Sequence, residues 1–148
     1  MNLEYRLATE QDYDFAFSLK KSAEYEPINA IFGWDEALQQ QMHAEEWAAG
    51  KPMLICIDGI AVGSYKIEIN ADYIHFCRFF LLPEHQGKGI GSKVLNQLIT
   101  LAKEQQLPCK LSHLQGNRVG ELYARFGFVI DDSDSQFVYM SRVLSTNA

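Results

Sequence analysis

Glycines at alternate positions between residues 87 and 91 form the clearest chemical pattern of this 148-residue sequence. Gly87, Gly89 and Gly91 follow an apolar run that ends at Pro83, and apolar residues at helical spacing follow them as far as Ala102. This order predicts a strand, a loop and a helix. Glycine lets a ligand approach the backbone, and the N–H groups and dipole of a helix N-terminus favour an anion. The pattern therefore predicts a ligand that carries phosphate.

Two common phosphate-binding motifs do not fit this spacing. A Walker loop requires Ser or Thr directly after its lysine, whereas Lys88 is followed by Gly89. The dinucleotide fingerprint requires its third glycine three positions after the second, and Gly91 comes one position early. A glycine turn that only opens a helix is the plainest alternative.

The spacing that does fit is Q-x-x-G-x-G, formed by Gln86, Gly89 and Gly91. It resembles the pyrophosphate-binding motif of the GNAT superfamily of acetyl-CoA-dependent N-acetyltransferases. A second segment, NRVGELYARFGF at residues 117–128, resembles the later motif of that family and departs from it at Gly120, where the family has alanine. The resemblance covers about residues 73–130 and, before them, only the order of elements.

The resemblance implies acetyl-CoA as cosubstrate, with the acyl carbonyl near the backbone of Phe79 or Phe80. Lys88 or Lys93 would add positive charge beside the pyrophosphate. The residues implied in cofactor binding come from the strand, the glycine loop and the second motif; they are Phe80, Leu81, Leu82, Gln86, Gly87, Lys88, Gly89, Ile90, Gly91, Ser92, Asn117 and Tyr123.

Transfer of an acyl group to an amine needs a base for the amine and a proton for the departing thiolate. The family tyrosine that protonates the sulfur of coenzyme A corresponds to Tyr123, and a tyrosine packed in the core is the alternative. His75 lies eleven residues before Gln86, where some family members carry a glutamate base, and an imidazole suits that task. A histidine packed on a strand face is the alternative there. His113, Glu24 and Glu26 are rival bases.

The acceptor site is expected in an aromatic and acidic segment between residues 24 and 34, which reads as a mobile loop. Its candidate acceptor-binding residues are Glu24, Glu26, Phe32 and Trp34. Together with other acids at residues 35, 36, 45 and 46, they favour a primary amine as acceptor, either a small molecule or a peptide, and would attract a cationic one. A non-catalytic acyl-CoA-binding module and a peptide-docking domain remain alternative functions.

Composition sets the remaining expectations. The net charge is −6, yet between residues 73 and 130 seven Lys and Arg residues stand against three Glu. This division favours an anionic cofactor and argues against nucleic acid. No apolar run approaches twenty residues and the first residues lack a signal-peptide pattern, so we expect a soluble cytoplasmic protein without membrane contact. Three cysteines without C-x-x-C spacing predict buried free thiols and no metal. The oligomeric state, monomer or homodimer, is open.

The length predicts one domain over residues 1–148. Strands are expected at 2–8, 53–57, 60–69, 73–82, 108–114, 127–130 and 137–143, and helices after Thr9, at 35–49, at 90–105 and from Asn117. The order β-α-α-β-β-β-α-β-α-β-β is a mixed α/β (α+β) arrangement and is similar to the GNAT fold.

Overall fold

The computed structural model describes residues 2–144, in which seven strands and four α-helices follow the expected order. The strands are β1 (Leu3–Leu7), β2 (Met53–Ile57), β3 (Ile60–Ile69), β4 (Ile74–Leu81), β5 (Cys109–Leu114), β6 (Val129–Ser133) and β7 (Phe137–Arg142). The helices are α1 (Tyr13–Ile31), α2 (Glu36–Ala49), α3 (Ile90–Gln105) and α4 (Val119–Arg125), and short 3-10 turns occupy Glu10–Asp12 and Pro83–His85.

The strands form one sheet in the order β1-β2-β3-β4-β5-β7-β6. β4 and β5 are parallel, with Ile74 opposite Cys109, whereas β1–β2, β2–β3, β5–β7 and β6–β7 are antiparallel. The mixed α/β sheet expected from the sequence is therefore confirmed. None of the helices formed by residues 2–144 has the length and apolar character needed to cross a membrane.

The chain divides into two compact units. The first comprises the residues up to Lys66 together with Arg78–Gln86, and the second comprises Ile67–Cys77 and the residues from Gly87 onward. β3 and β4 therefore contribute residues to both units.

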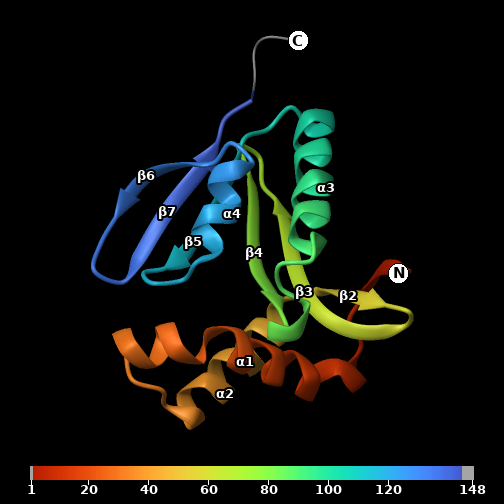
Figure 1. Ribbon diagram of the computed structural model, residues 1–148, viewed down its shortest axis with the longest axis vertical. Helices are drawn as coiled ribbons and strands as arrows, with labels where there is room; N and C mark the ends of the chain where they lie inside the picture. Colours follow the sequence, from red (N-terminus) through yellow and green to blue (C-terminus); the bar gives the residue numbers. More distant parts are fainter. Residues whose placement is uncertain (1, 145–148) are drawn as a thin grey trace. The chain divides into compact units, whose positions relative to one another are not determined.

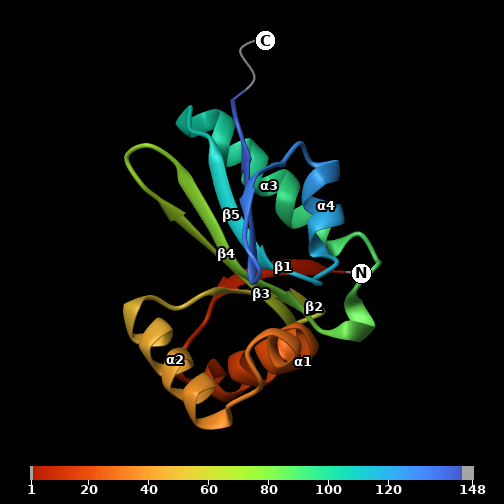
Figure 2. The same ribbon diagram turned by 90° about the vertical axis from the view of Figure 1, so that its left-hand side faces the viewer.

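In the first unit, α1 and α2 lie side by side (Figures 1 and 2) and pack through aromatic rings. His43 of α2 is 5% exposed, its Nε2 donates to the carbonyl oxygen of Tyr13 at 2.9 Å, and its ring contacts those of Phe17 and Trp47. Trp47 then joins Leu54 and Cys56 of β2 in the core. Aromatic burial of this kind dominates core energetics, so it fixes both helices against the strand.

The prediction of a loop beginning at Glu24 is wrong, because α1 continues to Ile31 with Pro27 inside it. Proline removes one helical hydrogen bond, which is why the sequence pattern predicts an end there. Beyond the proline, however, Ile28 is 5% exposed, and its burial favours continuation of the helix. The helix ends at Ile31 with Phe32 as its C-cap, and Gly33 directly after the cap has φ +77° and donates its N–H to the carbonyl oxygen of Asn29 at 3.1 Å.

In the second unit, α3 buries one apolar face, as its spacing predicts. Its buried residues are Ile90, Gly91, Val94, Leu95, Leu98 and Ala102. Figure 1 shows β5 in teal and β7 and β6 in blue with α4 beside them, and Leu111 of β5 lies opposite Met140 of β7. β6 begins at Val129 and extends to Ser133, later and longer than predicted, and both Val129 and Ile130 are exposed.

Candidate functional site

The glycine loop has the geometry that a phosphate group requires. Gly87 has φ +74° and Gly89 has φ +83°, a left-handed conformation that favours glycine. Gly89 caps α3, and its carbonyl oxygen accepts the N–H of Lys93 at 3.2 Å. A Cβ atom added at Gly87 or Gly89 would meet nothing within 4 Å. The loop backbone is thus open to a ligand, at a helix N-terminus whose first N–H groups have no intrahelical partner.

The first residues of α3 are buried in the core, whereas those of the glycine loop are exposed. Ile90 is 1% exposed and Gly91 is buried, whereas the loop residues Gly87, Lys88 and Gly89 are all exposed. Ser92 is half-buried in the first turn. Because the helix end is fixed by the core, the exposed N–H groups are held in place before a ligand arrives, which favours binding.

The middle of β4 carries a non-glycine residue in a left-handed conformation. Arg78 has φ +51° within the strand, a conformation that costs an ordinary residue about 1–2 kcal/mol. Three contacts hold it in place: its carbonyl oxygen accepts the Ser64 hydroxyl at 3.0 Å, its Nη2 donates to the carbonyl oxygen of Gly50 at 2.7 Å, and its Nη1 lies 3.7 Å from Glu46. Such over-determined strain is typical of functional sites.

The strand residues after Arg78 have defined partners in the first unit. The N–H of Leu82 donates to the carbonyl oxygen of Val62 at 2.9 Å. The side-chain amide of Gln86 donates to the carbonyl oxygen of Leu81 at 3.0 Å, and so closes the turn that precedes the glycine loop. Phe80 and Leu81 are half-buried.

Tyr123 lies in the core of the second unit. It is 4% exposed, and its ring centroid lies 6.4 Å from Phe76, 6.1 Å from His113 and 5.9 Å from Phe128. Asn117 accepts the N–H of Val119 at 3.0 Å through its side-chain oxygen and so orders the turn before α4. The helix begins at Val119 with Arg118 as its N-cap, slightly later than the predicted start at Asn117.

His75 lies on the opposite face of β4 from Phe76 and hence from Tyr123, because neighbouring strand residues alternate. Its Nδ1 is 2.9 Å from Oε1 of Glu68. A carboxylate can only accept, so in the neutral ring Nδ1 carries the proton and Nε2 carries the lone pair. The structure thus brings His113 to Tyr123 and Glu68 to His75, and it keeps His75 and Tyr123 on different faces.

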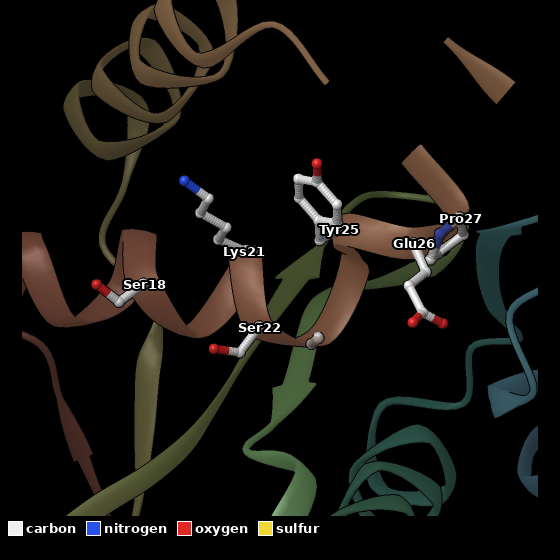
Figure 3. Close-up of a pocket in the computed structure, with 7 residues that line it drawn as sticks. Ser18, Lys21, Ser22, Tyr25, Glu26 and Pro27 are labelled. Atoms are coloured by element: carbon white, nitrogen blue, oxygen red, sulfur yellow. The ribbon is translucent and has the colours of Figure 1, made fainter. Parts of the chain in front are cut away.

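The predicted acceptor residues are only partly brought together. A pocket of about 560 Å³ runs along α1 (Figure 3) and is lined by Ser18, Lys21, Ser22, Ala23, Tyr25, Glu26 and Pro27. In Figure 3, Lys21 and Tyr25 project to one side of the helix and Glu26 to the other. Of the four predicted residues only Glu26 is part of this lining.

Trp34 lies beside the pocket through its contacts with two lining residues. Its ring centroid is 5.2 Å from that of Tyr25, and the Lys21 ammonium lies 5.6 Å from the ring. Phe32 is 51% exposed, and Glu24 is half-buried. The aromatic segment is therefore ordered against α1 at Trp34.

Three of the acids that the sequence suggests for binding an acceptor already have partners within the chain. Glu36 lies 3.1 Å from the Lys21 ammonium and accepts the indole N–H of Trp34, and these two contacts, the indole first, hold the pKa of Glu36 below its usual value. Asp35 accepts the N–H of Leu38 at 3.1 Å as the cap of α2, and Glu46 faces Arg78. These three acids have partners within the chain, and exposed Glu26 is the acid that lines the pocket.

The comparisons with known proteins agree with this geometry. The family described as "Acetyltransferase (GNAT) domain" matches residues 49–130, which is more than half of the chain. The chain belongs to the GNAT acetyltransferase family. Comparison with curated protein sequences found no match.

Solved structures of GNAT acetyltransferases share the fold of this one over nearly its whole length. The PaiA N-acetyltransferase of Thermoplasma acidophilum, in complex with coenzyme A, is 19% identical with a TM-score of 0.74, covering 97% of this chain and 100% of its own. A GNAT acetyltransferase of Brucella melitensis in complex with acetyl-CoA is 16% identical, with a TM-score of 0.65 and coverages of 99% and 91%. Arabidopsis thaliana Naa50, in complex with the bisubstrate analogue CoA-Ac-MVNAL, is 16% identical, with a TM-score of 0.68 and coverages of 97% and 100%.

Several residues of the α1 pocket and of the His75 contact are not among those predicted from the sequence. Ser18, Lys21, Ser22 and Tyr25 follow the spacing of one helix face, and that signal would have been visible had the segment around Pro27 been read as a helix. Glu68 gives no signal of its own, because its contact with His75 depends on the pairing of two strands.

Proposed function

We propose that the chain is an acetyl-CoA-dependent N-acetyltransferase that transfers an acetyl group to a primary amine in a direct ternary complex. The observation that carries the proposal is the open glycine loop at the N-terminus of α3, with Gly87 and Gly89 in left-handed conformations. The sequence carries no motif of an activated cysteine or serine nucleophile, which favours direct transfer. We propose that the whole chain acts as one catalytic domain.

Acetyl-CoA supplies an activated acetyl group as a thioester. In our proposal, the backbone N–H groups from Gly87 to Ser92 bind its pyrophosphate, and exposed Lys88 adds positive charge. The backbone at Phe80, Leu81 and Leu82 lies along the pantetheine arm, and Asn117 and Gln86 contribute side chains that also order the local backbone.

Two residues handle protons in this proposal. Nε2 of His75 carries the lone pair that accepts the amine proton, because the contact with Glu68 keeps the other proton on Nδ1. The hydroxyl of Tyr123, which remains protonated at neutral pH, donates to the departing sulfur. Because His75 lies on the other face of β4, we propose that the amine proton reaches its Nε2 through a water route.

The acceptor is a primary amine of a small molecule or a peptide, bound along the α1 pocket with Glu26 facing its charge on one side of the helix. Trp34, beside Tyr25 on the other side, contacts the rest of the acceptor. Glu24 and Phe32 complete the proposed acceptor site. A peptide-like acceptor is consistent with the likeness to Naa50, which was crystallised with a bisubstrate analogue. We propose a cytoplasmic enzyme, monomeric or homodimeric, without nucleic acid or membrane partners.

The test is an acetyl-transfer screen against polyamines, aminoglycosides, amino acids and short peptides, with acetylated products detected by mass spectrometry. We expect at least one amine class to be acetylated by the wild type and not by Gly89→Asp. Binding of acetyl-CoA without transfer to any amine would instead favour the non-catalytic acyl-CoA-binding module. The alternative function follows if Tyr123, which is only 4% exposed, is a core residue and not the proton donor.

A further inference from the structure

Three different metal-ligand side chains meet on the half-buried face shared by β3 and β4 in the second unit. Nδ1 of His75 and Oε1 of Glu68 are 2.9 Å apart, and Sγ of Cys77 lies 3.9 Å from the same oxygen. All three ligand atoms lie within 4.8 Å of one another. His75 and Cys77 are two residues apart on β4, so they project from the same face, and Glu68 comes from β3.

The spacing is close to that of a tetrahedral metal site. Zinc bonds of about 2.3 Å to sulfur and about 2.1 Å to nitrogen or oxygen place the ligand atoms roughly 3.3–3.6 Å apart. The observed separations bracket these values, so rotation of the side chains alone brings the ligands into place. The side chains of His75 and Glu68 are 37% and 43% exposed, which gives an ion a direct path from solvent.

The chemistry of the ligands selects the metal. One thiolate, one imidazole and one carboxylate suit Zn²⁺, whereas Mg²⁺ and Ca²⁺ prefer oxygen ligands alone. Three protein ligands leave the fourth position to water. Cys77 is only half-buried and can therefore be reached by a metal ion. Cys109, in contrast, lies in the apolar core, where burial raises the pKa of its thiol.

We propose that Glu68, His75 and Cys77 form a Zn²⁺ site, and that Zn²⁺ bound there inhibits acetyl transfer. Binding displaces the proton of the Cys77 thiol to solvent and uses the lone pair of His75 Nδ1. The remaining ring proton then moves to Nε2, which loses the lone pair that accepts the amine proton. The metal binding stands on the geometry of the cluster alone, whereas the inhibition rests on the proposed function.

The metal site is tested with Co²⁺ as a spectroscopic probe on the full chain, without acetyl-CoA. We expect one equivalent to bind with a thiolate charge-transfer absorption that Zn²⁺ removes by displacement. Cys77→Ser abolishes this absorption, and both Cys77→Ser and Glu68→Gln weaken binding by about tenfold or more. Two control variants should retain the spectrum. Cys56→Ala removes a buried thiol elsewhere, and Glu104→Gln changes an exposed acid on α3. No stoichiometric thiolate absorption, or its persistence in Cys77→Ser, overturns the site.

The inhibition is tested by acetyl transfer with an amine identified in the screen, in the presence and absence of Zn²⁺. Product is measured by mass spectrometry, because Zn²⁺ also binds the free thiol of coenzyme A. We expect about tenfold or greater inhibition of the wild type at saturating Zn²⁺, and Cys77→Ser to keep its metal-free rate and resist inhibition. Transfer that is unaffected by stoichiometrically bound Zn²⁺ overturns the inhibition and the role of His75 while leaving the metal site. Metal binding without transfer to any amine overturns the proposed function alone.

Discussion

A Cβ atom added to Gly120 would lie 2.7 Å from Nε2 and 2.9 Å from Cε1 of His113. The imidazole on β5 therefore fills the space that a methyl group on α4 would need. Two further contacts hold the ring, since its Nδ1 lies 3.0 Å from the carbonyl oxygen of Leu114 and its ring centroid lies 6.1 Å from that of Tyr123. This pairing explains why glycine stands where the family motif has alanine.

Gly120→Ala should lower the free energy of unfolding by about 1–3 kcal/mol, because the added methyl group forces a packed ring to move. Helix propensity alone would give a change of the opposite sign, since alanine is favoured over glycine within a helix by about 1 kcal/mol. The sign of the effect, measured by urea unfolding, therefore separates packing from propensity.

The double variant Gly120→Ala with His113→Ala is the control for this pairing. With the ring removed, the same substitution at residue 120 should become neutral or stabilising, which gives a coupling energy of about 1–3 kcal/mol in a double-mutant cycle. Additive effects of the two substitutions would show that the ring and the methyl group do not compete for space.

The sequence predicts the fold well wherever local signals and tertiary contacts agree. Two predictions that rest on neighbouring residues alone are confirmed: the turn at Asp58 and Gly59, and the apolar face of α3. The prediction of a loop at Pro27 is wrong, because the helix continues past this local helix breaker and Ile28 beyond it is only 5% exposed.

The glycine loop should bind the pyrophosphate of acetyl-CoA, and Gly89→Asp tests this. The carboxylate and Cβ would occupy the open space at a φ of +83°, so coenzyme A affinity should fall by about 100-fold or more by calorimetry. Gly59→Asp is a matched control, because Gly59 has φ +82° and also nothing within 4 Å of an added Cβ. Both variants should lose a similar amount of stability, about 1–2 kcal/mol, which is the cost of the left-handed conformation for a non-glycine residue. Only Gly89→Asp should lose affinity for coenzyme A.

Tyr123→Phe should reduce turnover by roughly 10² to 10⁴ while leaving acetyl-CoA affinity nearly unchanged, because only the proton donor is removed. The ring contacts with Phe76 and Phe128 remain in the variant. Tyr65→Phe is the control, since Tyr65 is 3% exposed and its ring packs edge-on against Tyr5 at 5.6 Å. Equal and small effects of the two substitutions on turnover would assign Tyr123 to the core.

The candidate site can be predicted from the sequence only where one segment builds it. The positive φ values of Gly87 and Gly89 follow from residue type, so the loop is visible in the sequence. The Glu68–His75 contact depends on strand register, and the neutralisation of Glu36 depends on Lys21 fifteen residues before it. The cationic partners of Glu36 and Glu46 are Lys21 and Arg78, which come from other elements, so the sequence alone does not show these ion pairs.

The stability of the protein should fall in acid through Asp12, which closes the first turn before α1. Asp12 lies 2.8 Å from Arg6 and accepts the N–H of Thr9, and these contacts, the Arg6 hydrogen bond first, lower the pKa of Asp12 to about 2. In the unfolded chain the pKa of an aspartate is about 3.9. The stabilisation is therefore fully present above about pH 4 and is lost as the pH falls through about 2.

Asp12→Asn removes this contribution while keeping a side-chain oxygen for the cap. The variant should be less stable than the wild type by about 1 kcal/mol at pH 7, a value reduced for screening because the Arg6 side chain is 47% exposed, and the difference should vanish near pH 2. Urea unfolding at pH 7, 4 and 2 measures it. Asp14→Asn, an exposed acid in the first turn of α1, serves as the control. A difference between wild type and Asp12→Asn that stays constant from pH 7 to pH 2 would show that the amide disturbs the cap itself and that the ion pair with Arg6 contributes nothing.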